Sequence, residues 1–153
     1  MKRAFQILGI VFVVLMLLLG CFIGYAAYFG TRLDASSKEY VDIAIPAIVS
    51  NWSEAELKTR SAPQLMEGST PEQFTKLFHW LSSLGPMKKY CGSKGTSNVF
   101  VSPQHGKTVS ARYTACAQFE KGDAAIDVVL VQNKDNVWKI AGFHVNSQAL
   151  IPQ

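Results

Sequence analysis

Residues 107–120 have the sequence KTVSARYTACAQFE, in which apolar and polar side chains alternate with a period of two. This alternation is typical of a β-strand with one packed face and one solvated face. The packed face is predicted to carry Val109, Ala111, Tyr113, Ala115, Ala117 and Phe119. The pattern therefore predicts an antiparallel sheet whose core lies on that side.

Turn signals flank this strand and divide the C-terminal half into a meander. The segment NVFV (98–101) precedes Pro103-Gln104-His105-Gly106 and is the expected hairpin partner. Glu120-Lys121-Gly122-Asp123 leads into AAIDVVLVQ, and Asn133-Lys134-Asp135-Asn136 leads into VWKIAGFHV. These two apolar segments are the expected next strands.

Three helices are expected before the sheet. Residues 34–52 carry an apolar stripe at helical spacing, and Pro46 predicts a kink or a restart within it. A capping-box pattern at 53–56 begins a short helix that ends before Pro63, and a second cap at 70–73 begins a helix over about 71–84. Gly85-Pro86 ends that helix, whose packed face has Phe74, Leu77, Phe78 and Leu81.

The N-terminus is dominated by an uncharged run, AFQILGIVFVVLMLLLGCFIGYAAYFG (4–30), which is long enough to cross a bilayer as a helix. Its length and its apolar C-terminal end favour a retained anchor over a cleaved signal peptide. Lys2 and Arg3 place the N-terminus in the cytoplasm by the positive-inside rule. We expect an anchor over residues 1–32, embedded in a lipid bilayer, and one extracytoplasmic α+β domain over 33–153.

Two features inside the anchor have competing interpretations. Leu18-Leu19-Gly20-Cys21 resembles a lipoprotein cleavage box with Cys21 as the lipidation site, but Leu19 is bulky and the sequence that follows is apolar. Gly20 and Gly24 form a G-x-x-x-G spacing that lets two helices pack closely, as in a homo-oligomer, although glycine is also common in membrane helices.

Charge argues against nucleic-acid binding. Lys2 and Arg3 supply two of the net charge of +4, and the rest shows no dense basic cluster with interleaved aromatic residues. The sequence therefore predicts no nucleic-acid partner.

Cys91 and Cys116 are the two cysteines outside the anchor. If the hairpin turn centres near residue 105, they lie close to each other but not directly opposite, and a bulge at Gly92 or Gly95 would bring them together. A disulfide is expected in an oxidising compartment, and two unrelated thiols are the alternative.

Three helices followed by a sheet, with Gly85-Pro86 between them and Trp138-Lys139-Ile140-Ala141-Gly142-Phe143 as the closing strand, resemble the nuclear transport factor 2-like (cystatin-like) superfamily. The resemblance is closest to small bacterial membrane-anchored domains. It implies a curved antiparallel sheet and helices that form a cone, at the periplasmic side of the bacterial inner membrane. The fold does not select a function.

No catalytic or metal-ligating pattern stands out. His79, His105 and His144 have no spacing for a shared metal, and no cofactor motif is present. An isomerase-like reading would pair Asp127 with Tyr113, but Asp127 is more simply an outward-facing strand residue. His79-Trp80 could line the mouth of the cone.

Three functions remain open at this point. The first is a non-enzymatic interaction or accessory subunit of an envelope complex with a membrane protein as partner; inner-membrane subunits of type IV secretion systems with this fold have a similar layout. The second is binding of a small apolar ligand or lipid in the cone. The third is an isomerase-like enzyme. The pocket of the second is expected to be lined by Phe74, Phe78, Trp80, Tyr113 and Phe119.

Overall fold

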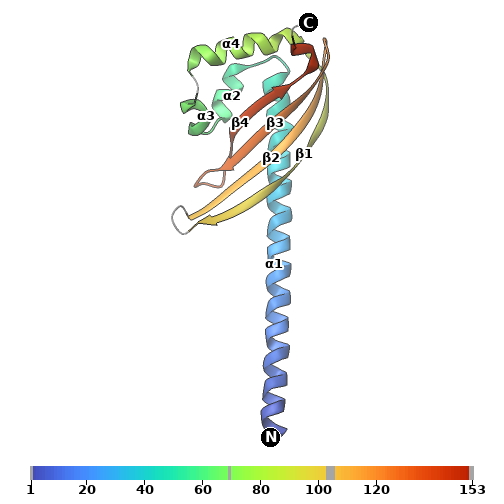
Figure 1. Ribbon diagram of the computed structural model, residues 1–153, viewed down its shortest axis with the longest axis vertical. Coiled ribbons are helices and arrows are strands. Elements are labelled where there is room, and N and C mark those ends of the chain that lie inside the picture. The colour runs from blue at the N-terminus through green and yellow to red at the C-terminus, as the bar shows by residue number, and fades with distance from the viewer. Residues whose placement is uncertain (1, 69, 103–105, 152–153) are drawn as a thin grey trace. The chain divides into compact units, whose positions relative to one another are not determined.

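The structure is a computed structural model that describes residues 2–68, 70–102 and 106–151, with side chains from Phe12 onward except that of Ala26. It is an α+β protein with a long apolar N-terminal helix and a curved, four-stranded antiparallel sheet (Figure 1). The chain divides into two compact units, Met1–Leu33 and Asp34–Gln153. The sequence placed this boundary one residue earlier.

Helix α1 (Lys2–Val49) contains the apolar N-terminal run. It is long and apolar enough to cross a membrane. Every described large apolar side chain from Phe12 to Phe29 is exposed. A helix that is apolar all round is unfavourable in water, because none of that surface is removed from solvent. Lipid is the environment that suits it.

The second part of α1, residues 34–49, belongs to the second unit and carries the predicted buried stripe. Its buried apolar residues are Val41, Ala44, Ile45, Ile48 and Val49. The predicted restart at Pro46 is wrong, because α1 continues to Val49. Pro46 removes one helical N–H, yet its own carbonyl accepts from the backbone N–H of Ser50 at 3.0 Å. Burial of the residues around it stabilises the helix through the proline.

Three short helices follow α1: α2 (Glu54–Arg60), α3 (Pro63–Glu67) and α4 (Pro71–Leu81). The Thr70–Gln73 capping box is complete at the start of α4, whereas Ser53 caps α2 without a return bond from Glu56, whose carboxylate binds Arg60 instead. A 3₁₀ turn, η1 (Ser82–Leu84), carries α4 to the predicted end at Gly85. The sequence missed α3, which has only five residues.

The strands are β1 (Met87–Ser102), β2 (Gly106–Phe119), β3 (Asp123–Gln132) and β4 (Trp138–Asn146), followed by η2 (Gln148–Leu150). Their order, β1-β2-β3-β4, confirms the meander. Val99 pairs with Val109, so the hairpin centres one residue earlier than expected. Its turn, 103–105, lies outside the described residues. β1 begins far earlier than predicted, because its glycines and polar residues resemble a loop in sequence.

The inner face of the sheet is a packed core. Its β2 contribution is the predicted set, Val109, Ala111, Tyr113, Ala115, Ala117 and Phe119, all buried. The Tyr113 hydroxyl lies 2.9 Å from Ser37 Oγ and donates to the Asp34 carbonyl at 3.1 Å. The ring of Phe119 stacks on Trp52 with centroids 5.0 Å apart. Residues 34–52 thus cover this face of the sheet.

Two aspartates of α1 attach the helix to β1. Asp34 Oδ1 accepts from both the backbone N–H and the hydroxyl of Ser97, at 2.6 and 2.5 Å. Asp42 Oδ1 accepts from Tyr90 and Ser93, at 2.7 and 2.6 Å, and Oδ2 accepts from Lys38. Partial burial raises the pKa of Asp42, but these hydrogen bonds outweigh burial and bring the pKa below its usual value. For Tyr90, burial and the bond to Asp42 raise the pKa.

Replacing Asp42 by Asn should lower the stability of the second unit at neutral pH by about 1 kcal/mol, because a partly exposed ionic acceptor is lost. A lowered folded-state pKa contributes stability above the unfolded value of about 3.9, and that stability is lost as the pH falls through the folded value. Wild type should therefore lose more stability than Asp42→Asn between about pH 5 and pH 2. Urea unfolding of the detergent-solubilised chain, followed by tryptophan fluorescence, measures this, since Trp52, Trp80 and Trp138 all lie in the second unit. The exposed Asp135→Asn variant is the control, and equal acid sensitivity of wild type and Asp42→Asn would contradict the assignment.

Replacing Gly95 by Ala should disrupt the β1–β2 pairing. A Cβ at this position would lie 2.0 Å from the carbonyl oxygen of Arg112 and 2.7 Å from Tyr113 Cα, both of which are backbone atoms of the neighbouring strand. We expect a loss of about 3 kcal/mol or more in unfolding free energy, measured in the same way. Gly68→Ala is the matched control, because there the nearest atom is at an ordinary 3.6 Å. Equal stability of the two variants would contradict the close approach.

Candidate functional site

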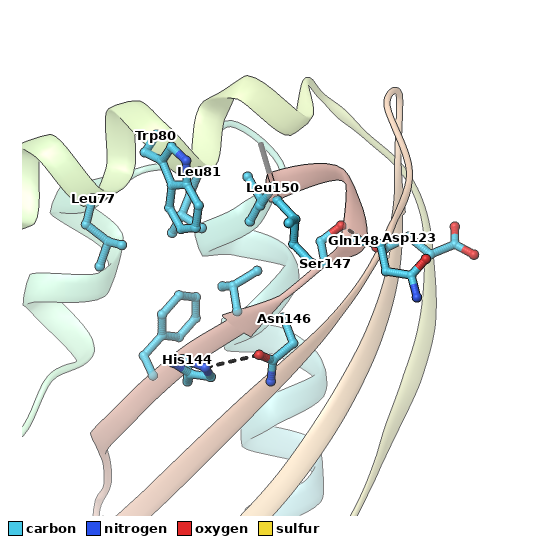
Figure 2. Close-up of a pocket in the computed structure, with 12 residues that line it drawn as sticks. Leu77, Trp80, Leu81, Asp123, His144, Asn146, Ser147, Gln148 and Leu150 are labelled. Atoms are coloured by element: carbon cyan, nitrogen blue, oxygen red, sulfur yellow. Dashed lines mark hydrogen bonds between the residues drawn. The ribbon is translucent and has the colours of Figure 1, made fainter. Parts of the chain in front are cut away.

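The second unit has a groove between α4 and the end of β4 (Figure 2). The volume of this groove is about 660 Å³. Leu77, Trp80 and Leu81 form the α4 side, and Phe143 to Asn146 form the β4 side. Leu150 and Ile151 come from the end of η2 and just beyond it. The groove is therefore built by elements that are distant in sequence, and its walls are mainly apolar.

Local sequence explains why α4 presents apolar side chains to this groove. The helix buries Phe74, Phe78 and Leu81 in the core, as predicted, but Leu77 is exposed, contrary to the prediction that it packs. Trp80, one turn further along, is 48% exposed. The apolar face of α4 is thus wider than the area that the domain covers.

Strand β4 is an edge strand, and its two halves differ. The first half is covered, because Ala62 N–H donates to the Ile140 carbonyl at 2.7 Å and Lys139 Nζ donates to the Thr59 carbonyl at 2.9 Å. Within residues 2–68, 70–102 and 106–151, no further backbone bond of this kind reaches 142–146 from outside the sheet. The second half of β4 therefore leaves strand-pairing groups beside an apolar groove.

The polar residues of the groove lie at its rim. His144 Nε2 is 3.1 Å from Asn146 Oδ1 (Figure 2). Asn146 Nδ2 in turn donates to Asp127 Oδ2 at 3.2 Å. Ser147 Oγ donates to the Asp123 carbonyl at 2.7 Å. These bonds fix the end of β4 in place, and they leave the interior of the groove to apolar side chains.

The five aromatic residues predicted to line a pocket do not come together in one. Phe74, Phe78, Tyr113 and Phe119 are buried side chains of the core, and Trp80 alone of the five lines the groove. The predicted convergence fails because residues 34–49 of α1 occupy the inner face of the sheet. These four aromatic side chains are packed in the core and do not surround an empty space.

Asp127 and Tyr113 lie on opposite faces of the sheet. Asp127 pairs with Thr114, accepts from its hydroxyl at 2.6 Å and faces outward, whereas Tyr113 faces the core. The outward interpretation of Asp127 is confirmed. The two side chains cannot act on one substrate, so an isomerase-like pairing has no geometric basis.

Cys91 and Cys116 are neighbours on the outer face of the β1–β2 pair. A bulge between Tyr90 and Gly92 makes Cys91 the extra residue, next to Gly92, which pairs with Cys116. The bulge lies at one of the two predicted positions, and Gly92 supplies the required positive φ of 96°. A hydrogen bond to Cys91, together with slight burial, raises the pKa of the Cys116 thiol. The two thiols are adjacent but not bonded in this structure.

The other predicted positions stay apart from the groove. Gly20 and Gly24 have open space around them, so a second helix could pack there. Cys21 is exposed. His79 is exposed on α4 and does not line the groove, and His105 lies outside the described residues. His144 lies at the groove rim.

Known proteins add no further information about the site. No protein family, no curated protein and no solved structure matches this chain. The functional argument therefore rests on the residues and their arrangement.

Most groove residues were missed from the sequence. Trp80 was named for the mouth of a cone, but Leu77, Phe143, Val145 and Ile151 were not recognised. One signal was available, since the last strand of a meander is an edge strand whenever the strands pair in chain order. In contrast, no sequence pattern predicts that the residues after β4 fold back toward α4.

In an oxidising compartment the Cys91 and Cys116 thiols should form a disulfide. Cross-linking two residues separated by a loop of this length stabilises a fold by about 3 kcal/mol in the chain-entropy account. The chain isolated from its native membrane with a thiol-blocking reagent should carry the cross-linked peptide, and Cys91→Ser should unfold at lower urea concentration under the same conditions. Alkylation of both cysteines without prior reduction would contradict the prediction.

Proposed function

We propose that this protein is a membrane-anchored, non-enzymatic interaction subunit whose groove between α4 and β4 binds an extended segment of a partner envelope protein. The observation that carries the proposal is the juxtaposition of an uncovered strand edge, 142–146, with the exposed apolar side chains of Leu77 and Trp80. An anchor restricts the domain to the membrane surface and raises its effective concentration for other membrane proteins.

The chemistry of the groove defines the segment that fits it. A strand added beside β4 gains backbone hydrogen bonds, and its alternate side chains point toward α4, where Trp80 and Leu77 offer apolar contacts. Aromatic residues such as Trp80 commonly contribute most to an interface, because they bury a large area at a low cost in side-chain entropy. A short extended peptide with apolar residues at alternate positions is the expected ligand.

The proposal includes the compartment and the fold family. A curved sheet with helix α1 packed on its inner face supports membership of the cystatin-like superfamily with a filled cone. Lys2 and Arg3 before the apolar run support a cytoplasmic N-terminus and a periplasmic second unit in a bacterial inner membrane. The adjacent thiols fit such an oxidising compartment.

A small apolar ligand or lipid in the groove is the second candidate. The volume of the groove, about 660 Å³, falls within the usual range for small-molecule sites. The open strand edge favours a peptide, because an apolar small molecule makes no use of backbone N–H and C=O groups. Native mass spectrometry of the purified chain distinguishes the two, since a retained small molecule would support the second candidate.

Replacing Trp80 by Glu should abolish binding of the partner while leaving the domain folded, because Trp80 is exposed and its loss creates no cavity. The chain is purified from its native membrane in mild detergent, and partner stoichiometry is measured for wild type, Trp80→Glu and the control Gln118→Glu. Gln118 is exposed on β2 and does not line the groove. A photo-cross-linking amino acid at position 80, but not at 118, should attach to the same partner. A partner retained equally by Trp80→Glu, or a wild-type chain that always purifies alone, would contradict the proposed function.

A further inference from the structure

The tip of the β1–β2 hairpin has an exposed apolar surface that the groove does not explain. Val99, Phe100 and Val101 are consecutive, and Phe100 and Val101 are 68% and 70% exposed. Val99 and Val101 occupy one face of the hairpin and Phe100 the other, so the tip is apolar on both faces. The preceding residues of β1, from Lys94 to Asn98, are polar or glycine. The exposed large apolar residues of β1 are therefore confined to the last residue pairs before the hairpin turn.

Contacts inside the second unit place this tip beyond the point where the chain joins that unit. Residues 34–52 and β1 run in opposite directions, because Asp34 bonds Ser97, Asp42 bonds Ser93 and the Trp52 indole donates to the Gly85 carbonyl at 3.2 Å. The five residues after Ser97 continue past Asp34. At about 3.4 Å per residue, Phe100 lies about 10 Å beyond Ser97, and Ser102 about 17 Å beyond it. Figure 1 shows this hairpin extending past the β3–β4 turn.

An anchor that crosses the bilayer as far as Arg32 would place the membrane surface close to Asp34. Asp34 follows Arg32, the first charge after the apolar run, by two residues, which is about 3 Å along a helix. The headgroup region on each side of a bilayer is about 5 to 8 Å thick. A tip that reaches 10 to 17 Å beyond Ser97 is long enough to cross that region.

Charge on the hairpin matches a lipid surface. Between Met87 and Phe119 the sequence has no Asp or Glu, and its charged residues are Lys88, Lys89, Lys94, Lys107 and Arg112. Lys107 pairs with Val101 at the tip itself. Basic residues around an exposed apolar group are typical of segments that bind anionic lipid headgroups and insert apolar side chains between them.

We propose that Val99, Phe100 and Val101 form a second membrane contact, which inserts into the extracytoplasmic leaflet of the bilayer that α1 crosses and prefers anionic lipid. This inference rests on the anchor of the proposed function but not on its partner. The tip and α1 would then hold the domain at two points, which limits its rotation about the anchor and directs the groove to a fixed side.

The test uses the purified full-length chain in lipid nanodiscs, with no partner protein present. A photo-cross-linking phenylalanine analogue is placed at position 100, at Gln118 as the negative control and at Phe22 within the anchor as the positive control. The lipid adduct at 100 should exceed that at 118 by about tenfold, the ratio expected from burying one aromatic side chain. The excess should grow when phosphatidylglycerol replaces part of the phosphatidylcholine.

Hydrogen exchange provides an independent readout. In anionic nanodiscs the backbone of residues 98–102 and 106–109 should exchange more slowly than in detergent. Phe100→Asp should remove that protection while tryptophan fluorescence stays native. Equal lipid adducts at 100 and 118, with a strong adduct at 22, would overturn the proposal. Adducts that join two copies of the chain at position 100 would also overturn it and assign the tip to a dimer contact. Because no partner is present, a failure here is distinct from a failure of groove binding.

Discussion

The second unit depends on the attachment of α1 to β1 through Asp34 and Asp42. β1 is an edge strand rich in glycine and polar residues, and its apolar contribution to the core is small. Two carboxylates that accept hydroxyl and amide donors from Tyr90, Ser93 and Ser97 compensate for that weakness. Because the hydrogen bonds involve charged acceptors, each is stronger than a bond between neutral groups. They also set how far β1 is displaced along the helix.

That displacement affects one end of the sheet, and the groove lies at the other. At one end it leaves the apolar rungs of the β1–β2 hairpin beyond Asp34, with no described side chain of the domain burying Phe100. At the other end, the chain after β4 returns toward α4 and closes the groove with Leu150. The register between α1 and β1 therefore positions the surface proposed for lipid, and the groove proposed for protein is built separately by α4, β4 and η2.

Sequence periodicity predicts the elements well wherever each side chain is either clearly buried or clearly exposed to solvent. The alternation in β2 and the capping box at Thr70 both indicated elements that the structure has, because burial and hydrogen bonding there act on neighbours in sequence. β1 was underestimated because Gly95 and its polar neighbours lack a strand pattern. Gly95 is needed in a strand because the backbone of Arg112 and Tyr113 approaches it closely, and that contact is between segments far apart in the chain.

The site was harder to predict than the fold for the same physical reason. Aromatic residues on α4 and β2 share an apolar character whether they fill a core or line a pocket, and the outcome depends on what covers the sheet. Here residues 34–49 of α1 occupy the inner face, so Phe74, Phe78, Tyr113 and Phe119 have no space beside them. Trp80 lies one turn from the buried Leu84, and its side chain remains outside the core because η2 and β4 stop short of covering it. A residue acquires an exposed apolar surface when the packing around it ends, and where packing ends is a property of the whole fold. The surface proposed for binding therefore follows from how far each element extends, rather than from any local motif.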